Sequence, residues 1–210
     1  MSTRMKREQR RESAHEELRT LATELTLPQE VEGDSERICD AVVDRRIAVG
    51  RPLNVVAASS LYTACRVNHT PVTIRELALV SGSNPKEIGG CYRSIVSAMN
   101  MNLPSLNGSS YVLKLAAKAN ASEGSTTLAV EIVRRATDWG LGDRYPMTLA
   151  AAAVYTASLT MGENRTQAGL ADLAGVSEAS VRDCAKAIRR LMSARGGEDE
   201  RQTKDGQRVS

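Results

Sequence analysis

The feature that most constrains the fold of this chain is an internal duplication. Residues 53–96 align with residues 146–189 at a constant offset of 93 without a gap, and eleven of the 44 positions are identical. Ala-rich helices share some residues by chance, but here a Thr, a Tyr, a Gly and a Cys match in one register. A repeat of this kind is typical of an architecture in which one supersecondary unit occurs twice. The sequence therefore predicts two similar domains.

Each copy has the pattern of a small helical bundle. Aromatic residues make up 3% of the chain and Phe is absent, whereas Ala and Leu abound, and small side chains favour closely packed helices. In the first copy, the apolar periodicity predicts helices over residues 13–25, from 29 or 34 to 49, 53–67, 73–80 and 85–101. The third of these is apolar nearly all round, so we expect it in the middle of its domain.

The second copy repeats this order. Its helices are expected over residues 109–120, 125–139, 146–161, 166–174 and 177–194. In both copies a short helix is joined to the last helix by a turn that contains Gly, which is typical of a helix-turn-helix hairpin. The predicted fold class is therefore all-α, with two tandem five-helix repeats that each end in such a hairpin.

The domain boundaries follow from charge and turn residues. Residues 1–12 form a basic N-terminal arm, because residues 1–11 contain five cations and one acid. Residues 13–101 form the first repeat, and residues 102–108 (NLPSLNG) form a linker marked by Pro and Gly. The second repeat covers residues 109–195. Residues 196–210 are polar without apolar periodicity, which predicts a disordered tail.

The hairpin over 166–190 is the segment with the clearest functional pattern. One face of its second helix is apolar at a 3.6-residue period: Val181, Cys184, Ala185, Ile188, Leu191 and Met192. The opposite face has small and polar residues at its start and cations along its length: Ala179, Ser180, Arg182, Lys186, Arg189 and Arg190. A DNA major groove accepts such a helix by its N-terminal end. Taken alone, the segment also fits an amphipathic surface helix with solvated cations.

Catalytic and metal-binding patterns are not found in the sequence. The four cysteines, Cys39, Cys65, Cys91 and Cys184, form no CxxC pair and fall on apolar helical faces, so buried free thiols are expected. No phosphate loop, nucleophile elbow or HExxH motif occurs. We expect neither an enzyme nor a cofactor or metal. No apolar run is long enough for a membrane span and no signal peptide is evident, so a cytoplasmic, nucleoid-associated protein is expected.

Paired signatures in the two copies resemble a known family. The first copy contains AASSLYTACR from residue 57 and KEIGGCYR from residue 86, and the second contains AAAAVYTAS from residue 150 and TQAGLADLAGVSEASVR from residue 166. This order resembles the cyclin-box core of archaeal transcription factor B, the counterpart of eukaryotic general transcription factor IIB, from about Ala14 to Met192. The resemblance implies a protein that binds a TATA-binding protein on promoter DNA, with the second hairpin reading an element upstream of the TATA box.

The resemblance also implies site residues. It places base contacts on Ala179 and Arg182 and phosphate contacts on Ser180 and Lys186, and we include Thr166, Gln167 and Arg189 in the same DNA-binding set. Ala179 stands where the family often has Val, so the absence of an apolar contact to a thymine methyl would weaken sequence preference by up to about 1–3 kcal/mol.

In the first copy, the resemblance places contacts with the TATA-binding protein on Arg66 and Lys86, and we include Arg93 in the same set. Two departures affect this surface. Gly90 replaces the family's usual Arg, and Pro85 stands where a second basic residue is common.

Family members begin with a zinc ribbon of paired CxxC-type motifs that recruits RNA polymerase, and these 210 residues contain none. We therefore expect a monomeric regulatory variant that competes with or substitutes for the full-length factor and engages RNA polymerase weakly or indirectly. The alternative is a cyclin-like protein-interaction module that does not bind DNA.

Overall fold

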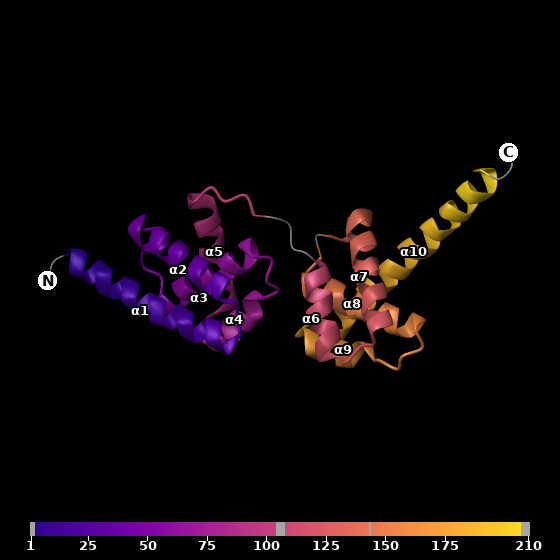
Figure 1. The fold of residues 1–210 in the computed structure, drawn as a ribbon, viewed down its shortest axis with the longest axis horizontal. Coiled ribbons are helices and arrows are strands. Elements are labelled where there is room, and N and C mark those ends of the chain that lie inside the picture. Colours follow the sequence, from indigo (N-terminus) through magenta and orange to yellow (C-terminus); the bar gives the residue numbers. More distant parts are fainter. Residues whose placement is uncertain (1–2, 104–107, 143, 207–210) are drawn as a thin grey trace. The chain divides into compact units, whose positions relative to one another are not determined.

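The computed structural model describes residues 3–103, 108–142 and 144–206. Over these ranges all regular secondary structure is helical, which confirms the predicted all-α class. The chain divides into two compact units, residues 1–106 and 107–210 (Figure 1). The division falls within the predicted linker 102–108, of which residues 104–107 lie outside the described residues.

In the first unit four helices surround a central one. The unit consists of α1 (Thr3–Glu24), α2 (Gln29–Asp44), α3 (Leu53–Val67), α4 (Ile74–Ser81) and α5 (Pro85–Ala98). Helix α3 packs against each of the other four (Figure 1). Eleven consecutive residues of α3, Val55–Cys65, are buried. An apolar helix without a polar face thus takes the central position, as its sequence predicted.

The second unit has the same helix order. It consists of α6 (Gly108–Lys118), α7 (Glu123–Ala136), a π-helical turn η1 (Thr137–Leu141), α8 (Pro146–Thr160), α9 (Gln167–Ala174) and α10 (Glu178–Gly206). Helix α8 is the central element and packs against α6, α7, α9 and α10. Twelve of its fifteen residues are buried, among them the four consecutive alanines Ala150–Ala153.

Helix caps recur at the offset of 93 found in the sequence. Thr73 and Thr166 cap the N-termini of α4 and α9, and each side chain accepts a hydrogen bond from a backbone N–H in the first turn. Gly82 and Gly175 end these helices in the left-handed conformation, with φ of 61° and 63°. Three buried residues of α5, Ile88, Cys91 and Ile95, correspond to Val181, Cys184 and Ile188 of α10, and all six are fully buried. The duplication is therefore one of local structure as well as sequence.

The predicted N-terminal arm 1–12 differs from the structure, in which residues 3–12 are the first part of α1. Helix α1 begins well before Ser13 because its early residues bind the rest of the unit. Arg11 pairs with Asp40 at 3.0 Å and Asp44 at 2.6 Å, and Arg10 Nη2 donates to the Arg51 carbonyl at 2.9 Å. The prediction used apolar periodicity alone, and these charged contacts do not produce such a pattern.

Two helix ends also differ from the predictions. Helix α2 ends at Asp44 rather than near Val49, because Arg46 has a left-handed φ of 56° and Ile47 N–H turns back to the Val42 carbonyl. Helix α10 continues to Gly206, whereas the sequence analysis predicted a disordered tail over 196–210. This segment contains no Pro and is rich in Glu, Arg, Lys and Gln, whose intrinsic propensity favours helical backbone. Residues 207–210 of the predicted tail lie outside the described residues.

Candidate nucleic-acid interface

The second hairpin is formed by α9, a turn of three residues and the first part of α10. Gly175 leaves α9 in the left-handed conformation, where an L side chain would be strained. Ser177 precedes α10, and its hydroxyl accepts a hydrogen bond from Ser180 N–H at 3.2 Å, as an N-cap does. These two residues therefore end α9 and cap the start of α10.

The apolar face of α10 is packed into the second unit. Val181, Cys184, Ala185 and Ile188 are fully buried, and Leu191 and Met192 are half-buried. The same helix contacts α8 and α9. This packing fixes which side of α10 faces solvent, and that side carries the DNA-binding residues predicted on this helix: Ala179, Ser180, Arg182, Lys186 and Arg189.

Arg182 pairs with an acidic residue on its own helix. Its Nη1 lies 3.5 Å from Glu178 Oε1, and the two side chains are 46% and 50% exposed. An exposed pair at this spacing contributes only about 0.3–0.5 kcal/mol. Arg182 is therefore held near the N-terminal end of α10 by an ion pair that is easily exchanged.

The remaining predicted residues are polar positions around the turn. Ser180 is exposed, and its hydroxyl lies 2.7 Å from that of Ser177. Thr166 is exposed, and its side chain accepts a hydrogen bond from Gly169 N–H at 3.1 Å as the N-cap of α9. Gln167 is half-buried at the first position of α9.

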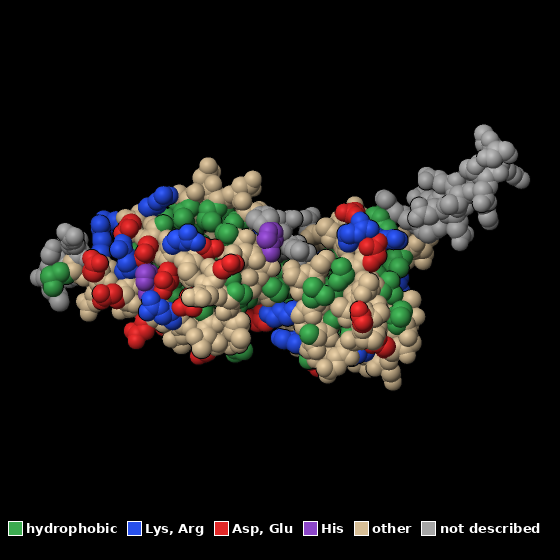
Figure 2. Space-filling model, in the orientation of Figure 1, with side chains coloured by type: hydrophobic (Ala, Val, Ile, Leu, Met, Phe, Trp, Pro, Cys, Tyr) green, Lys and Arg blue, Asp and Glu red, His purple; other side chains and the backbone are tan. Residues whose placement is uncertain are grey.

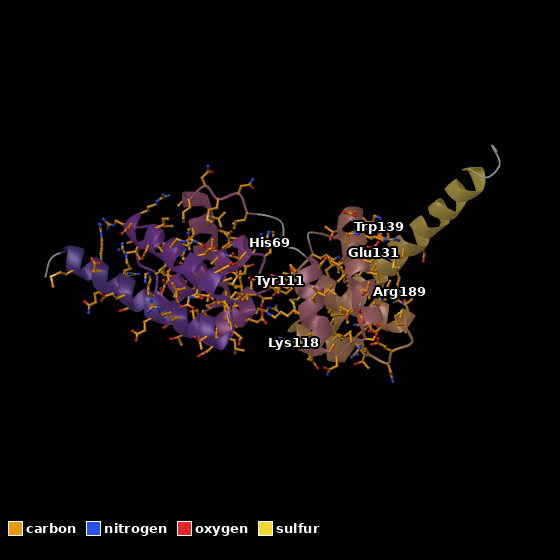
Figure 3. The ribbon with its side chains drawn as sticks, viewed as in Figure 1. His69, Tyr111, Lys118, Glu131, Trp139 and Arg189 are labelled. Carbon is orange, nitrogen blue, oxygen red and sulfur yellow. The ribbon has the colours of Figure 1, made fainter. Side chains whose placement is uncertain are left out.

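Farther along α10, cations cluster on the exposed side. Lys186, Arg189, Arg190 and Ser193 line a shallow depression, and Figure 3 labels Arg189 on this helix. Among the described side chains, none of these three cations has an acidic partner within ion-pair distance. Arg190 and Ser193 were not in the predicted set, although their spacing from Lys186 on a helix places them on the same side.

The loop before α9 contains an ion pair, Glu163 and Arg165, that the sequence analysis missed and that binds the segment between α6 and α7. Arg165 Nε lies 3.0 Å from Glu163 Oε2, and the Arg165 guanidinium also donates to the carbonyls of Ala119 and Asn120. Glu163 Oε1 accepts from the hydroxyls of Ser122 and Ser125. The hydrogen bonds from Ser122 and Ser125, with help from Arg165, lower the pKa of Glu163 to about 2. The clamp formed by Glu163 and Arg165 positions the start of α9 relative to α6 and α7.

In the first unit, the three predicted protein-contact residues lie on α3 and α5. Arg66 is half-buried and its Nη1 donates to the Tyr92 hydroxyl at 3.0 Å, which links it to α5. Lys86 is exposed on the first turn of α5. Arg93 is also exposed and lies over Gly89, whose added Cβ would be 3.7 Å from Arg93 Nη1. A guanidinium also covers Gly90, since Arg51 Nη2 would lie 3.7 Å from a Cβ there.

The cysteines are buried free thiols. Burial raises the pKa of Cys39 to about 11 and also raises the pKa of Cys91 and Cys184. Within the described ranges, no group of three or more His, Cys, Asp or Glu side chains is placed to hold a metal ion. Of the helices in these ranges, none combines the length and apolar character required to cross a membrane.

Comparison with curated proteins finds relatives among archaeal transcription factors. The chain is 35% identical over 171 residues to transcription initiation factor IIB 1 of Thermoplasma volcanium, covering 81% of this chain and 55% of the relative. It is 34% identical over 171 residues to transcription initiation factor IIB of Sulfurisphaera tokodaii, covering 81% and 56%. A Methanococcus maripaludis factor IIB is 37% identical over 168 residues, covering 80% and 50%. The chain thus spans about half the length of the curated relatives it matches.

The family model of the transcription factor TFIIB repeat matches twice, over residues 7–98 and 101–190. Each match covers most of one helical unit, and the family is one of transcription factors, not enzymes. The first match begins at residue 7, within α1, in agreement with the extended first helix. With two repeats matched over most of its length, the chain belongs to the transcription factor TFIIB repeat family.

Proposed function

We propose that this protein acts in transcription initiation by binding a TATA-binding protein and the promoter DNA upstream of the TATA box. One observation carries the DNA-binding part of the proposal. At the repeat offset of 93, Arg182 and Arg189 correspond to Gly89 and Val96, so these α10 cations have no counterpart in the first hairpin. Two hairpins with the same caps and the same buried face thus differ on the exposed side of their second helix. Lys186 corresponds to Arg93, whereas the further cations Arg182 and Arg189 are found on α10 alone of the two helices.

The geometry of α10 supports a division of tasks among its residues. Ala179 and Arg182 lie near the N-terminal end, which enters the major groove in proteins with this motif. An Arg at such a position binds the O6 and N7 atoms of guanine, and the small Ala179 allows close approach. Lys186 and Arg189 lie farther along the helix and would contact phosphates, with Ser180 and the α9 residues Thr166 and Gln167 beside them. Glu178 would release Arg182 when DNA binds.

The first unit is proposed to contact the TATA-binding protein through Arg66, Lys86 and Arg93. Lys86 and Arg93 are seven residues apart, which places them on one side of α5 about two turns from each other. Tyr92 brings Arg66 to the same helix. The half-buried Arg51 supplies a guanidinium over Gly90 in place of a side chain at position 90 itself. Long cations at the rim of an interface mainly set the association rate and the specificity.

We further propose that residues 1–210 by themselves engage RNA polymerase only weakly or indirectly. The four cysteines of these residues are each buried as a free thiol and do not form the paired motifs of a zinc ribbon. A chain that occupies the same promoter complex would compete with a full-length factor for it. Added in excess to in vitro transcription, these 210 residues should lower the output of the full-length factor, whereas stimulation in its absence would indicate substitution.

An electrophoretic mobility shift separates the two contacts. With a TATA-containing promoter fragment and an archaeal TATA-binding protein, the chain should produce a slower complex that depends on the TATA-binding protein. Lys86→Glu should weaken this complex on every promoter, whereas Arg182→Ala should weaken it only on promoters with the preferred upstream element. A chain that binds neither DNA nor the TATA-binding protein at low salt would instead favour a protein-interaction module.

A further inference from the structure

A pocket in the first unit is distinct from both contact surfaces. Its volume is about 320 Å³, and it lies between the N-terminal part of α1, the end of α2 and the connection to α3. The inner wall is apolar and is formed by Val42, Ala48 and Val56, all buried. Arg7, Arg10 and Arg46 also line it. The pocket therefore combines an apolar floor with guanidinium groups.

The cations of this pocket are not neutralised by neighbouring acids. Elsewhere on α1, Arg11 pairs with Asp40 and Asp44, and Arg19 pairs with Glu36 at 2.9 Å. By contrast, no described acidic side chain lies within ion-pair distance of Arg7 or Arg46, and Arg10 binds only a backbone carbonyl. Figure 2 shows Lys and Arg gathered over α1 and the neighbouring α2, with acidic side chains beside some of them. The described guanidinium groups that line the pocket are therefore not paired with carboxylates.

The turn that closes the pocket follows the C-terminus of α2. Arg46 has φ of 56°, the left-handed conformation that also follows α1 at Thr26 and α3 at His69, and Ile47 N–H donates to the Val42 carbonyl. The turn buries Ala48 and leaves Val49 66% exposed beside Arg46.

We propose that this pocket binds an acidic segment of a partner protein. One bulky apolar side chain of the segment enters between Val42, Val43 and Val56, and carboxylates on either side of it meet Arg7, Arg10 and Arg46. Pockets of roughly 300 Å³ or more with a few convergent polar groups suit such an anchor. Arg binds carboxylates with paired hydrogen bonds. A DNA backbone would supply anions but would leave the apolar floor uncovered.

The probe is a short fluorescein-labelled peptide in which Leu and Phe are interspersed among Asp, measured by fluorescence anisotropy with the full chain. Two control peptides separate the requirements. One keeps the Asp residues and replaces Leu and Phe with Ser, and the other keeps Leu and Phe and replaces Asp with Asn. The parent peptide should bind about tenfold more tightly than either control, since both the apolar and the charged contacts are needed.

Adjacent residues provide a matched pair of variants. Arg46→Glu places an acid in the pocket, whereas Arg45→Glu makes the same change in net charge at an exposed neighbour that does not line it. We expect Arg46→Glu to weaken peptide binding by about tenfold and Arg45→Glu by less than about twofold. Val43→Phe, which fills the pocket from its wall, should weaken binding without a change in charge. Circular dichroism should show all three variants helical.

The proposal is wrong if the Ser peptide binds as well as the parent, if the two Glu variants have equal effects, or if no peptide binds. Displacement of the parent peptide by a DNA duplex whose own binding depends on Arg46 would also overturn it, because the pocket would then be a phosphate site.

Discussion

Arg182 and Glu178 face each other across one turn of α10, with 3.5 Å between Nη1 and Oε1. The residue that we propose to read a base is therefore loosely positioned near the N-terminal end of its helix. Under the proposed function, replacing it would remove an interaction that forms only with the correct base.

Arg182→Ala should lower the affinity of the promoter complex by about 1–3 kcal/mol on the preferred upstream element. On a fragment with a scrambled upstream element, the same substitution should have a much smaller effect, because Arg182 could bind only a phosphate there. Quantitative mobility shifts on both fragments measure the difference. Equal effects on the two fragments would mean that Arg182 binds the backbone and reads no base.

Glu178→Gln should strengthen binding on both fragments by up to about threefold. The substitution removes a negative charge next to the DNA, and the exposed pair that it breaks contributes only about 0.3–0.5 kcal/mol to the free chain. The same mobility shifts test it. A large decrease in affinity would show that Glu178 is required to hold Arg182 in place.

Lys186→Ala and Arg189→Ala should weaken binding uniformly across DNA sequences. Each substitution removes one cation from the phosphate backbone and should lower the slope of log affinity against log salt concentration by about 1. Binding measured between low and moderate salt gives this slope. Arg135→Ala, on α7 of the same unit, is an exposed control that should leave the slope unchanged, because Arg135 is already paired with Glu131 at 2.6 Å.

The pKa of Glu163 predicts a pH-dependent contribution to stability. Its folded pKa of about 2 lies below the unfolded value of about 4.3, so its stabilising effect is fully present above pH 4.3 and is lost as the pH falls toward 2. Glu163→Gln should therefore lower the melting temperature of the second unit at pH 7, and the difference from the native chain should shrink as the pH approaches 2.

Fluorescence of Trp139, the single Trp of the chain, follows the unfolding of this unit (Figure 3). Glu131→Gln is the matched control. The pKa of Glu131 is also lowered to about 2, but by Arg134 and Arg135 of the same helix, so its replacement should matter less for the fold. A Glu163 variant that melts like the native chain at pH 7 would contradict a structural role for the clamp.

Gly175→Ala should destabilise the second unit by about 1–2 kcal/mol. No atom lies within 4 Å of the added Cβ, so the cost arises from the left-handed backbone alone. Gly82→Ala is the matched change in the first unit, with φ of 61° and equally open space, and should cost about as much. Urea denaturation measures both. Only the Gly175 variant should also reduce the preference for the upstream element over a scrambled one, and an equal reduction by both would argue against a special role for the second hairpin.

Much of the fold was predictable because its signals are local. The central helix α3 was predicted over its full range, 53–67, and the caps Thr73 and Gly82 are residue types that end helices in any context. The buried face of α10 was predicted from its 3.6-residue period. The repeat offset predicted the central helix and the caps of the second unit from those of the first.

What escaped prediction depends on tertiary contacts. Residues 3–12 lack an apolar stripe and are helical in a segment tied down by the ion pairs of Arg11 with α2. The clamp of Glu163 and Arg165 joins segments about forty residues apart, and no local sequence pattern predicts a contact between segments so far apart. The pairing of Arg182 with Glu178 has the common spacing of four residues, but its relation to DNA stays a prediction.

The most direct test is site-directed DNA cleavage from a single added cysteine, which is possible because the native thiols are buried. Since Cys39, Cys65, Cys91 and Cys184 are all buried, Ala168→Cys adds an exposed thiol on α9, beside the proposed contact residues but outside that set, to which an iron–EDTA cleavage reagent can be attached. Leu113→Cys, exposed on α6, is the control position. In the presence of the TATA-binding protein, the reagent at residue 168 should cut promoter DNA just upstream of the TATA box, and the reagent at residue 113 should not. No cleavage from residue 168, or cleavage only downstream of the TATA box, would contradict the proposal that the hairpin of α9 and α10 binds the upstream element.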